Sequence, residues 1–187
     1  AHVIKETIRD AESRMKGALN NLEEDLAGIR TGRAHPALVE KLEVEYYGAM
    51  TQLNQLASIS VPEPRQLMIR PFEQSTVKTI ERALIASDLG ITPNSDGKVI
   101  RLNLPPLNEE RRRDLVKVTN NRLEESKVAC RNVRRDIIKD LREFEKEKLI
   151  SEDDLKRAED ELQKVTDRYI EEIEMVGERK TAEIMEV

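Results

Sequence analysis

Aromatic residues and cysteine are scarce in this chain. Its 187 residues include no tryptophan, two phenylalanines, three tyrosines and a single cysteine. A hydrophobic core must therefore be built mainly from aliphatic side chains, in one or two small domains. The lone Cys130 cannot form an internal disulfide and fits a reducing compartment, so we expect a cytoplasmic protein. No run of about 18 apolar residues is present, and we therefore predict no transmembrane helix.

Motifs typical of catalysis and metal binding are also missing. No glycine-rich phosphate loop follows a predicted strand, and no Gly-x-Ser-x-Gly sequence occurs. His2 and His35 are far apart, and we interpret His35-Pro36 as part of a turn rather than as a metal site. Cys130 lies beside the core-facing Ala129 in a helical pattern, which indicates a packing residue rather than a nucleophile. We expect a protein that is not an enzyme and uses no metal or cofactor.

Prolines are confined to the middle of the chain, where the charge density is also low. All seven prolines lie between Pro36 and Pro106. Residues 31–104 carry 8 basic and 8 acidic side chains, whereas the remaining residues carry 24 basic and 29 acidic ones. A segment that differs from both of its flanks is typical of an inserted domain. We therefore predict a discontinuous domain, residues 1–30 and 105–187, with residues 31–104 inserted into it.

Both flanks have the hydrophobic periodicity of amphipathic helices. Apolar residues recur every three or four positions from Ile4 to Ile29. A second helix is predicted to begin at Asn108 and to continue without proline or glycine to about Lys148. Ser151 is predicted to cap a third helix, because three acidic residues follow it in the first turn. Since none of these helices would be stable alone, we predict a long antiparallel three-helix bundle.

The middle segment has the pattern of a small mixed α/β domain, so the predicted fold class is α+β. Residues 75–87 predict one helix, and residues 92–97 predict a loop. Alternating apolar and polar residues predict four strands, of which the second has the weakest pattern: 42–46, 56–61, 67–69 and 99–104.

Two short segments, residues 30–33 and 104–107, connect the middle segment to the bundle. Glycine permits a turn in the first, and paired prolines in the second continue neither a helix nor a sheet. Two rigid bodies are therefore expected to meet at a two-stranded hinge. The predicted hinge residues are Thr31, Gly32, Leu104, Pro105 and Pro106.

Three arginines lie on one face of the second predicted helix. Arg134 and Arg135 follow Arg131 by three and four residues, and such steps return to the same helix face. Lys127 and Arg142 extend this face in both directions. One interpretation is a polyanion-binding surface, because the planar fork of arginine matches phosphate geometry.

The alternative interpretation is a solvated face with ion pairs to nearby acids such as Glu124, Asp136 and Glu143. The protein would then be a helical-bundle adaptor or chaperone; a tRNA-binding module is a further possibility. Charge sorting favours phosphate binding. Residues 108–148 carry 13 basic and 10 acidic side chains, whereas residues 152–186 carry 6 and 13.

Seven short motifs follow one another along essentially the whole chain: 29–34 (IRTGRA), 44–48 (VEYYG), 86–90 (ASDLG), 93–95 (PNS), 101–112, 128–136 (VACRNVRRD) and 150–154 (ISEDD). Together they resemble the bacterial ribosome recycling factor family. Two departures are small, namely Asn108 where threonine is more usual and Cys130 where a small aliphatic residue is. Asparagine caps a helix as well as threonine does, so neither departure changes the expectation.

The resemblance implies an L-shaped fold, in which a three-helix bundle and a β/α/β sandwich domain are joined by a flexible elbow. It implies binding to the large ribosomal subunit after termination, in the space used by transfer RNA. With elongation factor G and GTP, such a protein dissociates the subunits so that ribosomes can start again. We expect a monomer that binds neither DNA nor membranes. Positions that match ribosomal-RNA contacts of the family are Arg131, Arg134 and Arg135, Arg30 and Arg33, and Arg111 and Arg112.

Overall fold

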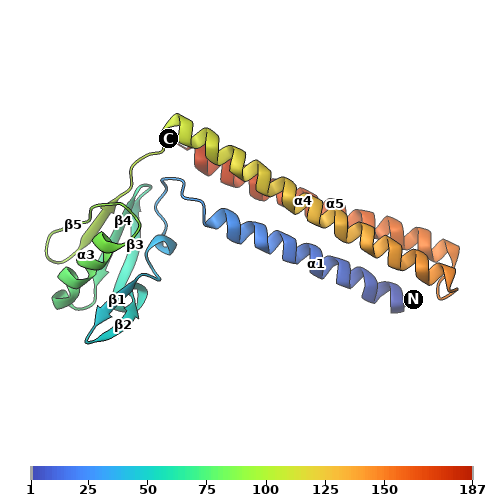
Figure 1. Ribbon diagram of the computed structural model, residues 1–187, viewed down its shortest axis with the longest axis horizontal. Helices are drawn as coiled ribbons and strands as arrows, with labels where there is room; N and C mark the ends of the chain where they lie inside the picture. Colours follow the sequence, from blue (N-terminus) through green and yellow to red (C-terminus); the bar gives the residue numbers. More distant parts are fainter. Residues whose placement is uncertain (1, 187) are drawn as a thin grey trace. The chain divides into compact units, whose positions relative to one another are not determined.

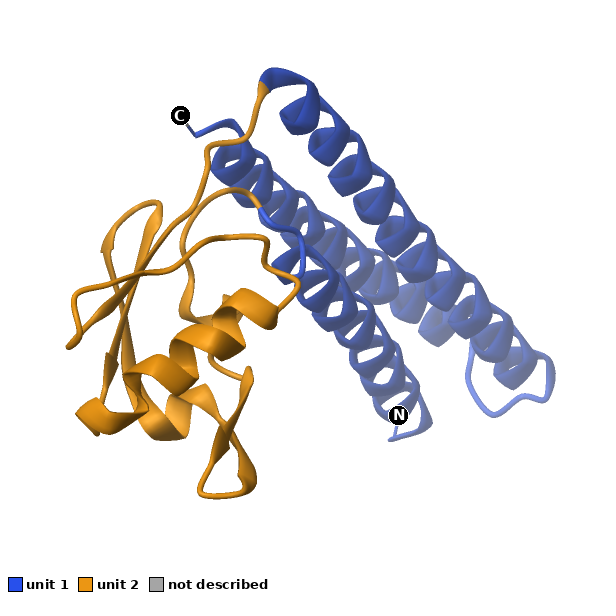
Figure 2. Cartoon of the chain, turned by 60° about the vertical axis from the view of Figure 1, so that its left-hand side comes forward, with its two compact units in different colours: residues 1–30, 109–186 blue, residues 31–108, 187 orange. Residues whose placement is uncertain are grey.

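The computed structural model describes residues 2–186, which form two compact units (Figure 2). Unit 1 extends to Arg30 and resumes from Glu109 to Glu186, and unit 2 spans Thr31–Asn108. The second boundary therefore follows Asn108, rather than Leu104 as the sequence predicts. The reason is that the segment after Leu104 still lies against unit 2: a Cβ on Gly32 would be 3.2 Å from the Pro105 carbonyl oxygen and 3.6 Å from Leu107 Cγ. Leu104 itself is 9% exposed and belongs to the hydrophobic core of unit 2, inside the predicted insert. Among residues 2–186, no helix is both long enough and apolar enough to cross a lipid bilayer.

Three long helices make up unit 1: α1 (His2–Ala27), α4 (Glu109–Lys146) and α5 (Glu152–Met185) (Figure 1). Each helix packs against the other two, as the three apolar stripes predict. At 1.5 Å per residue, the 38 residues of α4 extend over about 57 Å. The helix α1 ends at Ala27, two residues before the apolar pattern of the sequence ends at Ile29.

Helices of unit 1 that are consecutive in the sequence run in opposite directions. Arg14 pairs with Asp136, whereas Asp25, further along α1, pairs with Arg122, which is earlier on α4. These two helices therefore run in opposite directions. A short turn, residues 147–151, then reverses the chain between α4 and α5. The predicted antiparallel three-helix bundle is confirmed.

The core of unit 1 is aliphatic, as the shortage of aromatic residues requires. Met15, Ile137, Leu141, Leu162 and Ile173 are each at most 1% exposed. They come from all three helices. Removing such side chains from water is the main favourable contribution to packing helices that are marginal alone.

The cap predicted for the third helix is present at the start of α5. Ser151 Oγ accepts a hydrogen bond from the Asp154 backbone N–H at 3.0 Å, and Asp154 Oδ2 accepts one from the Ser151 N–H at 3.2 Å. This reciprocal capping box satisfies two donors that the helix itself leaves unpaired. Hydrogen bonds from the Ser151 backbone, and then from its side chain, lower the pKa of Asp154.

Unit 2 contains a two-stranded hairpin, a four-stranded sheet and the helix α3 (Val77–Ala86) (Figure 1). The hairpin pairs the first two strands, and the sheet has the antiparallel order β3-β4-β6-β5. The strands of the unit are β1 (Glu43–Tyr46), β2 (Ala49–Gln52), β3 (Ala57–Glu63), β4 (Gln66–Pro71), β5 (Asn94–Ser95) and β6 (Ile100–Asn103). Short helical turns are η1 (Pro36–Leu38), α2 (Leu53–Leu56) and η2 (Gln74–Thr76).

Strand alternation places one face of the four-stranded sheet in the core of unit 2. Leu67 and Ile69 of β4 are paired with Leu102 and Ile100 of β6. All four are at most 1% exposed, and Ile80 of α3 is fully buried in the same cluster. The predicted strands and helix thus give a small α/β unit, as expected.

Two strands of unit 2, β2 and β5, were not predicted. The strand β2 has the sequence AMTQ, which lacks a clear alternation. The strand β5 corrects the prediction of a loop over residues 92–97. Asn94 and Ser95 pair with Arg101 and Ile100, so two residues of that segment extend the sheet.

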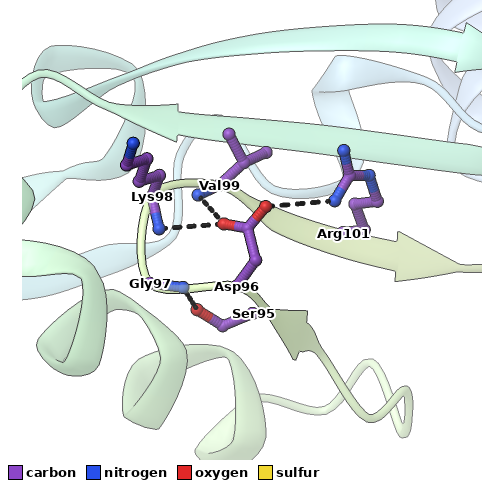
Figure 3. Close-up of polar contacts among 6 residues, drawn as sticks. All are labelled: Ser95, Asp96, Gly97, Lys98, Val99 and Arg101. Carbon is purple, nitrogen blue, oxygen red and sulfur yellow. Dashed lines mark hydrogen bonds and ion pairs between the residues drawn. The ribbon is translucent and has the colours of Figure 1, made fainter.

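The loop between β5 and β6 is closed by one carboxylate (Figure 3). Asp96 Oδ1 accepts hydrogen bonds from the backbone N–H groups of Lys98 at 2.9 Å and Val99 at 2.8 Å. Arg101 lies 3.6 Å from the other oxygen, Oδ2. The bonds from Val99 and Lys98 lower the pKa of Asp96, and the charge of Arg101 adds to this effect.

Both connecting segments are attached to the same turn of unit 2. The backbone N–H of Ala34 donates to the Pro64 carbonyl at 2.7 Å, and the N–H of Leu104 donates to the Arg65 carbonyl at 2.8 Å. Pro64 and Arg65 form the turn between β3 and β4. The chain therefore enters and leaves unit 2 at neighbouring carbonyl groups.

Gly32 has a backbone conformation that favours glycine. Its φ is 78°, and a Cβ at this position would lie 3.2 Å from the Pro105 carbonyl oxygen. A side chain here would be strained and would also press on the backbone of the second connecting segment. The close approach of the two segments thus depends on glycine.

Candidate nucleic-acid interface

Arg131, Arg134 and Arg135, the arginine cluster, lie within α4 and are oriented by buried neighbours. Val133 is 7% exposed and Ile137 is 1% exposed, so the opposite side of this helix segment packs into the bundle core. With a helix period of 3.6 residues, the three arginines must then project from the outer part of α4. The structure brings them together on one helix surface, as the spacing predicts.

The cluster is not uniformly exposed. Arg131 and Arg135 are exposed, whereas Arg134 is half-buried, although the sequence predicted it on the exposed face. Arg134 follows Lys127 by seven residues and therefore lies on the same side of α4. Lys127 contacts Glu174 of α5, so this side borders the neighbouring helix.

Two guanidinium groups of the cluster are available to a ligand. Within residues 2–186, neither Arg134 nor Arg135 forms an ion pair. Arg131 Nη1 lies 3.3 Å from Glu124 Oε1. Of the acids expected for a solvated face, Asp136 instead pairs with Arg14 of α1 at 3.0 Å. A face made of mutually neutralised side chains therefore does not describe the cluster.

The positive face is shorter than the sequence predicts, because α5 neutralises both of its ends. Lys127 Nζ lies 2.8 Å from Glu174 Oε1, and the hydrogen bond and charge of this lysine lower the pKa of Glu174. Arg142 Nε lies 3.3 Å from Glu159 Oε1. The unneutralised charge is thus concentrated at the arginine cluster itself.

A second group of arginines occupies the first turns of α4. Arg111 is exposed and Arg112 is half-buried, and the Arg112 Nε atom is buried without a hydrogen-bond partner in the described chain. Arg113 pairs with Glu109 at 2.7 Å. Twenty residues of helix separate Arg111 from Arg131, a distance of about 30 Å, so the structure does not join the two groups into one site.

The two arginines of the first connecting segment belong to different units. Arg30 is exposed and ends the first part of unit 1, and Arg33 is exposed in unit 2. Next to Arg30, the carbonyl oxygen of Ile29 accepts a hydrogen bond from Lys180 Nζ at 3.1 Å. Sequence reasoning missed Lys180, since a single lysine in a charged helix gives no signal that it is buried.

His35 and Cys130 have structural roles, as the sequence indicates, although Ala129, which was predicted to face the core, is only half-buried. His35 Nδ1 accepts a hydrogen bond from the Ala37 N–H at 3.0 Å and caps η1, so it belongs to a turn. Cys130 is fully buried in the bundle core, and burial raises its pKa. No group of three or more metal-ligating side chains occurs within residues 2–186.

Together these features define a class of protein, in which a discontinuous helical bundle carries an arginine cluster and an inserted α/β unit. A family model described as "Ribosome recycling factor" matches residues 22–185. The ribosome-recycling factor of Roseiflexus castenholzii is 55% identical over 185 residues, covering 99% of this chain and 100% of that protein. That of Symbiobacterium thermophilum is 53% identical over 183 residues, covering 98% and 99%. The chain belongs to the ribosome recycling factor family.

Solved structures agree with this assignment. A solution structure of the ribosome recycling factor has a TM-score of 0.76 and 45% identity, with 98% of each chain covered. A second similar structure describes the Thermus thermophilus factor and Escherichia coli elongation factor G bound to the Escherichia coli post-termination complex. Its TM-score is 0.65, at 45% identity and with 98% of this chain and 99% of that chain covered.

Proposed function

We propose that this protein binds the large ribosomal subunit of post-termination complexes and, with elongation factor G and GTP, dissociates the subunits. Membership of the ribosome recycling factor family supports the proposal, as does the similarity to a factor placed with elongation factor G on such a complex. Ribosomes released in this way can begin another round of translation. The protein acts in the cytoplasm as a monomer and binds neither DNA nor membranes.

The arginine cluster is the observation that carries the proposed contact with ribosomal RNA. Arg134 and Arg135 have no carboxylate partner within residues 2–186, and their planar donor groups suit phosphate. RNA helices are recognised largely through phosphates and sugar hydroxyls, which suits arginines spaced along one straight helix. Arg30, Arg33, Arg111 and Arg112 add further contacts.

The connecting segments act as the hinge between the units. Thr31, Gly32, Pro105 and Pro106 provide the pivot, since prolines donate no hydrogen bonds and Gly32 permits the turn. Leu104, which we expected within the hinge, is held in the core of unit 2 and forms its fixed base. A change in orientation of the units would then not disturb either core.

The protein supplies binding and mechanical coupling, and the GTP is hydrolysed by the elongation factor. No reacting group of the protein and no metal or cofactor takes part. The purified chain should therefore hydrolyse neither GTP nor ATP. Hydrolysis by the chain alone that persists through repeated purification would contradict this part of the proposal.

Subunit dissociation tests the proposal directly. Post-termination ribosomes are mixed with the protein, with or without elongation factor G and GTP, and light scattering reports the separated subunits. Dissociation should require all three components. Arg135→Ala should slow it, whereas Arg179→Ala, which removes an exposed arginine from α5, should not.

Other outcomes would identify the alternative functions. Equal rates for wild type, Arg135→Ala and Arg179→Ala would mean that the cluster does not contact RNA. Salt-sensitive binding to transfer RNA in preference to large subunits would indicate a tRNA-binding module. Salt-insensitive capture of helical proteins, without binding to ribosomes, would indicate an adaptor.

A further inference from the structure

The one ion pair of the arginine cluster, within the described residues 2–186, holds Arg131. Its partner, Glu124, lies seven residues earlier on α4, with Nη1 and Oε1 3.3 Å apart. Seven residues correspond to about 10 Å along the helix axis, so the two side chains must extend toward each other. The Arg131 guanidinium is thereby drawn toward the N-terminal end of α4, away from Arg134 and Arg135.

Glu124 binds the Arg131 guanidinium, which is the group that a phosphate would also bind. A guanidinium presents a fixed fork of N–H donors, and carboxylate and phosphate oxygens both bind to it. Arg131 and Glu124 have side chains that are 45% and 62% exposed, so solvent and ligand can reach the pair. RNA can engage the Nη1 donors of Arg131 fully only if Glu124 releases them.

We propose that Glu124 competes with RNA phosphate for Arg131 and thereby limits the affinity of the arginine cluster. This inference rests on the proposed function, because it assumes that the cluster contacts RNA. When Arg131 binds a phosphate, the ion pair to Glu124 is lost and a negative charge remains beside the RNA backbone. Both effects weaken binding, which favours release of the factor after each round.

The neighbouring Glu125 provides a matched control. It differs from Glu124 by one position and carries the same charge. However, its carboxylate pairs with Arg122 at 2.8 Å, and Arg122 also pairs with Asp25 of α1. Glu125 thus lies on the side of α4 that faces α1. A purely long-range effect of removing one negative charge should be similar at the two positions.

Equilibrium binding of the full-length protein to purified large subunits measures the competition. Glu124→Gln should tighten binding by up to about fivefold, the factor that corresponds to an exposed ion pair. Glu125→Gln should bind like the wild type. In an Arg131→Ala background, Glu124→Gln should lose most of its gain, because the residue for which it competes is gone. Thermal unfolding of each variant confirms that the bundle is intact.

Three results would overturn the inference. They are an unchanged affinity of Glu124→Gln, an equal gain for Glu125→Gln, and a gain that persists in full without Arg131. Arg131→Ala, Arg134→Ala and Arg135→Ala as single variants separate this failure from a failure of the proposed function. If all three bind like the wild type, the RNA contact itself is refuted, and the role of Glu124 with it. If they bind more weakly but Glu124→Gln shows no gain, only the competition is refuted.

Discussion

Gly177 of α5 lies directly against Leu123 of α4. A Cβ atom at position 177 would lie 2.9 Å from Leu123 Cδ2 and would overlap Cδ1. The Leu123 side chain can occupy this space because position 177 has no side chain. Glycine normally destabilises a helix interior. Gly177 therefore weakens α5 locally but leaves room for the Leu123 side chain.

Alanine substitutions at two helical glycines should have different effects. Gly177→Ala should be less favourable than Gly17→Ala, because the Leu123 side chain has to move to admit the new Cβ. A Cβ added at Gly17 of α1 would meet no atom within 4 Å, so Gly17→Ala should raise stability by about 0.5–1 kcal/mol. Urea unfolding followed by circular dichroism measures both. Equal shifts in the same direction would contradict the packing argument.

Arg134→Ala should weaken binding to the large subunit while leaving the bundle folded. Loss of a charge-assisted hydrogen bond costs about 1.5–3 kcal/mol, or roughly 10- to 150-fold in affinity. The slope of log affinity against log salt should fall by about one unit, because one phosphate contact is lost. Arg134→Lys should recover only part of the affinity, since lysine keeps the charge but not the planar fork.

If Arg134 makes no contact with phosphate, the wild type, Arg134→Ala and Arg134→Lys will bind the large subunit with equal affinity at two salt concentrations. Because Arg134 is half-buried, the unfolding midpoint of each variant is measured alongside binding. A large loss of stability would show that the side chain supports packing against α5 instead.

Gly32→Val should impair subunit dissociation more than it impairs folding. Valine would be strained at φ 78°, and its Cβ would press on the Pro105 carbonyl. Gly90 is a suitable control, because its φ is 66° but a Cβ there meets no atom within 4 Å. Gly90→Val should share the backbone strain without affecting the connecting segments. Wild-type dissociation rates for Gly32→Val would remove the support for a hinge at this residue.

Lys180→Met should destabilise the end of α1. Lys180 is 9% exposed, and its ammonium group donates to the Ile29 carbonyl. Methionine keeps most of the aliphatic stem but removes this charged donor, at a cost of about 1.5–3 kcal/mol. The exposed neighbour serves as a control, and Arg179→Met should change stability by less than about 0.5 kcal/mol. Chemical unfolding of wild type, Lys180→Met and Arg179→Met measures the free energy of unfolding of each protein.

Asp96 should make the stability of unit 2 depend on pH in the acidic range. Its pKa is lower in the folded chain than the unfolded value of about 3.9, so the ionised form stabilises the fold. This contribution is fully present above the unfolded pKa and is lost as the pH falls through the folded pKa. Asp96→Asn should be less stable than wild type at pH 7, and the difference should narrow below about pH 4. A difference that is constant with pH would contradict this role.

Sequence patterns predicted the long elements of the fold because periodicity accumulates over many residues. The stripe from Ile4 to Ile29 and the cap at Ser151 both led to observed helices. Two strands gave no such signal. The sequence AMTQ of β2 does not alternate, two residues in β5 are too few to show alternation, and β5 exists only because β6 lies beside it.

The candidate site was predictable only to the level of the helix face. Steps of three and four residues placed Arg131, Arg134 and Arg135 together, but not their exposure or partners. Whether Arg134 is half-buried depends on how α5 packs beside α4, which no local pattern specifies. The same holds for Lys180, whose burial follows from the position where α1 ends.

The attachment of both connecting segments to the turn at Pro64 and Arg65 has a consequence for how the chain folds. Closing a loop costs entropy that grows with the number of free residues between its ends. Before unit 2 forms, the whole segment from Thr31 to Asn108 separates α1 from α4. Once unit 2 is folded, its two ends are held at neighbouring carbonyls, and the helices are linked as if by a short loop. The insertion therefore delays assembly of the bundle far less than its length in sequence implies.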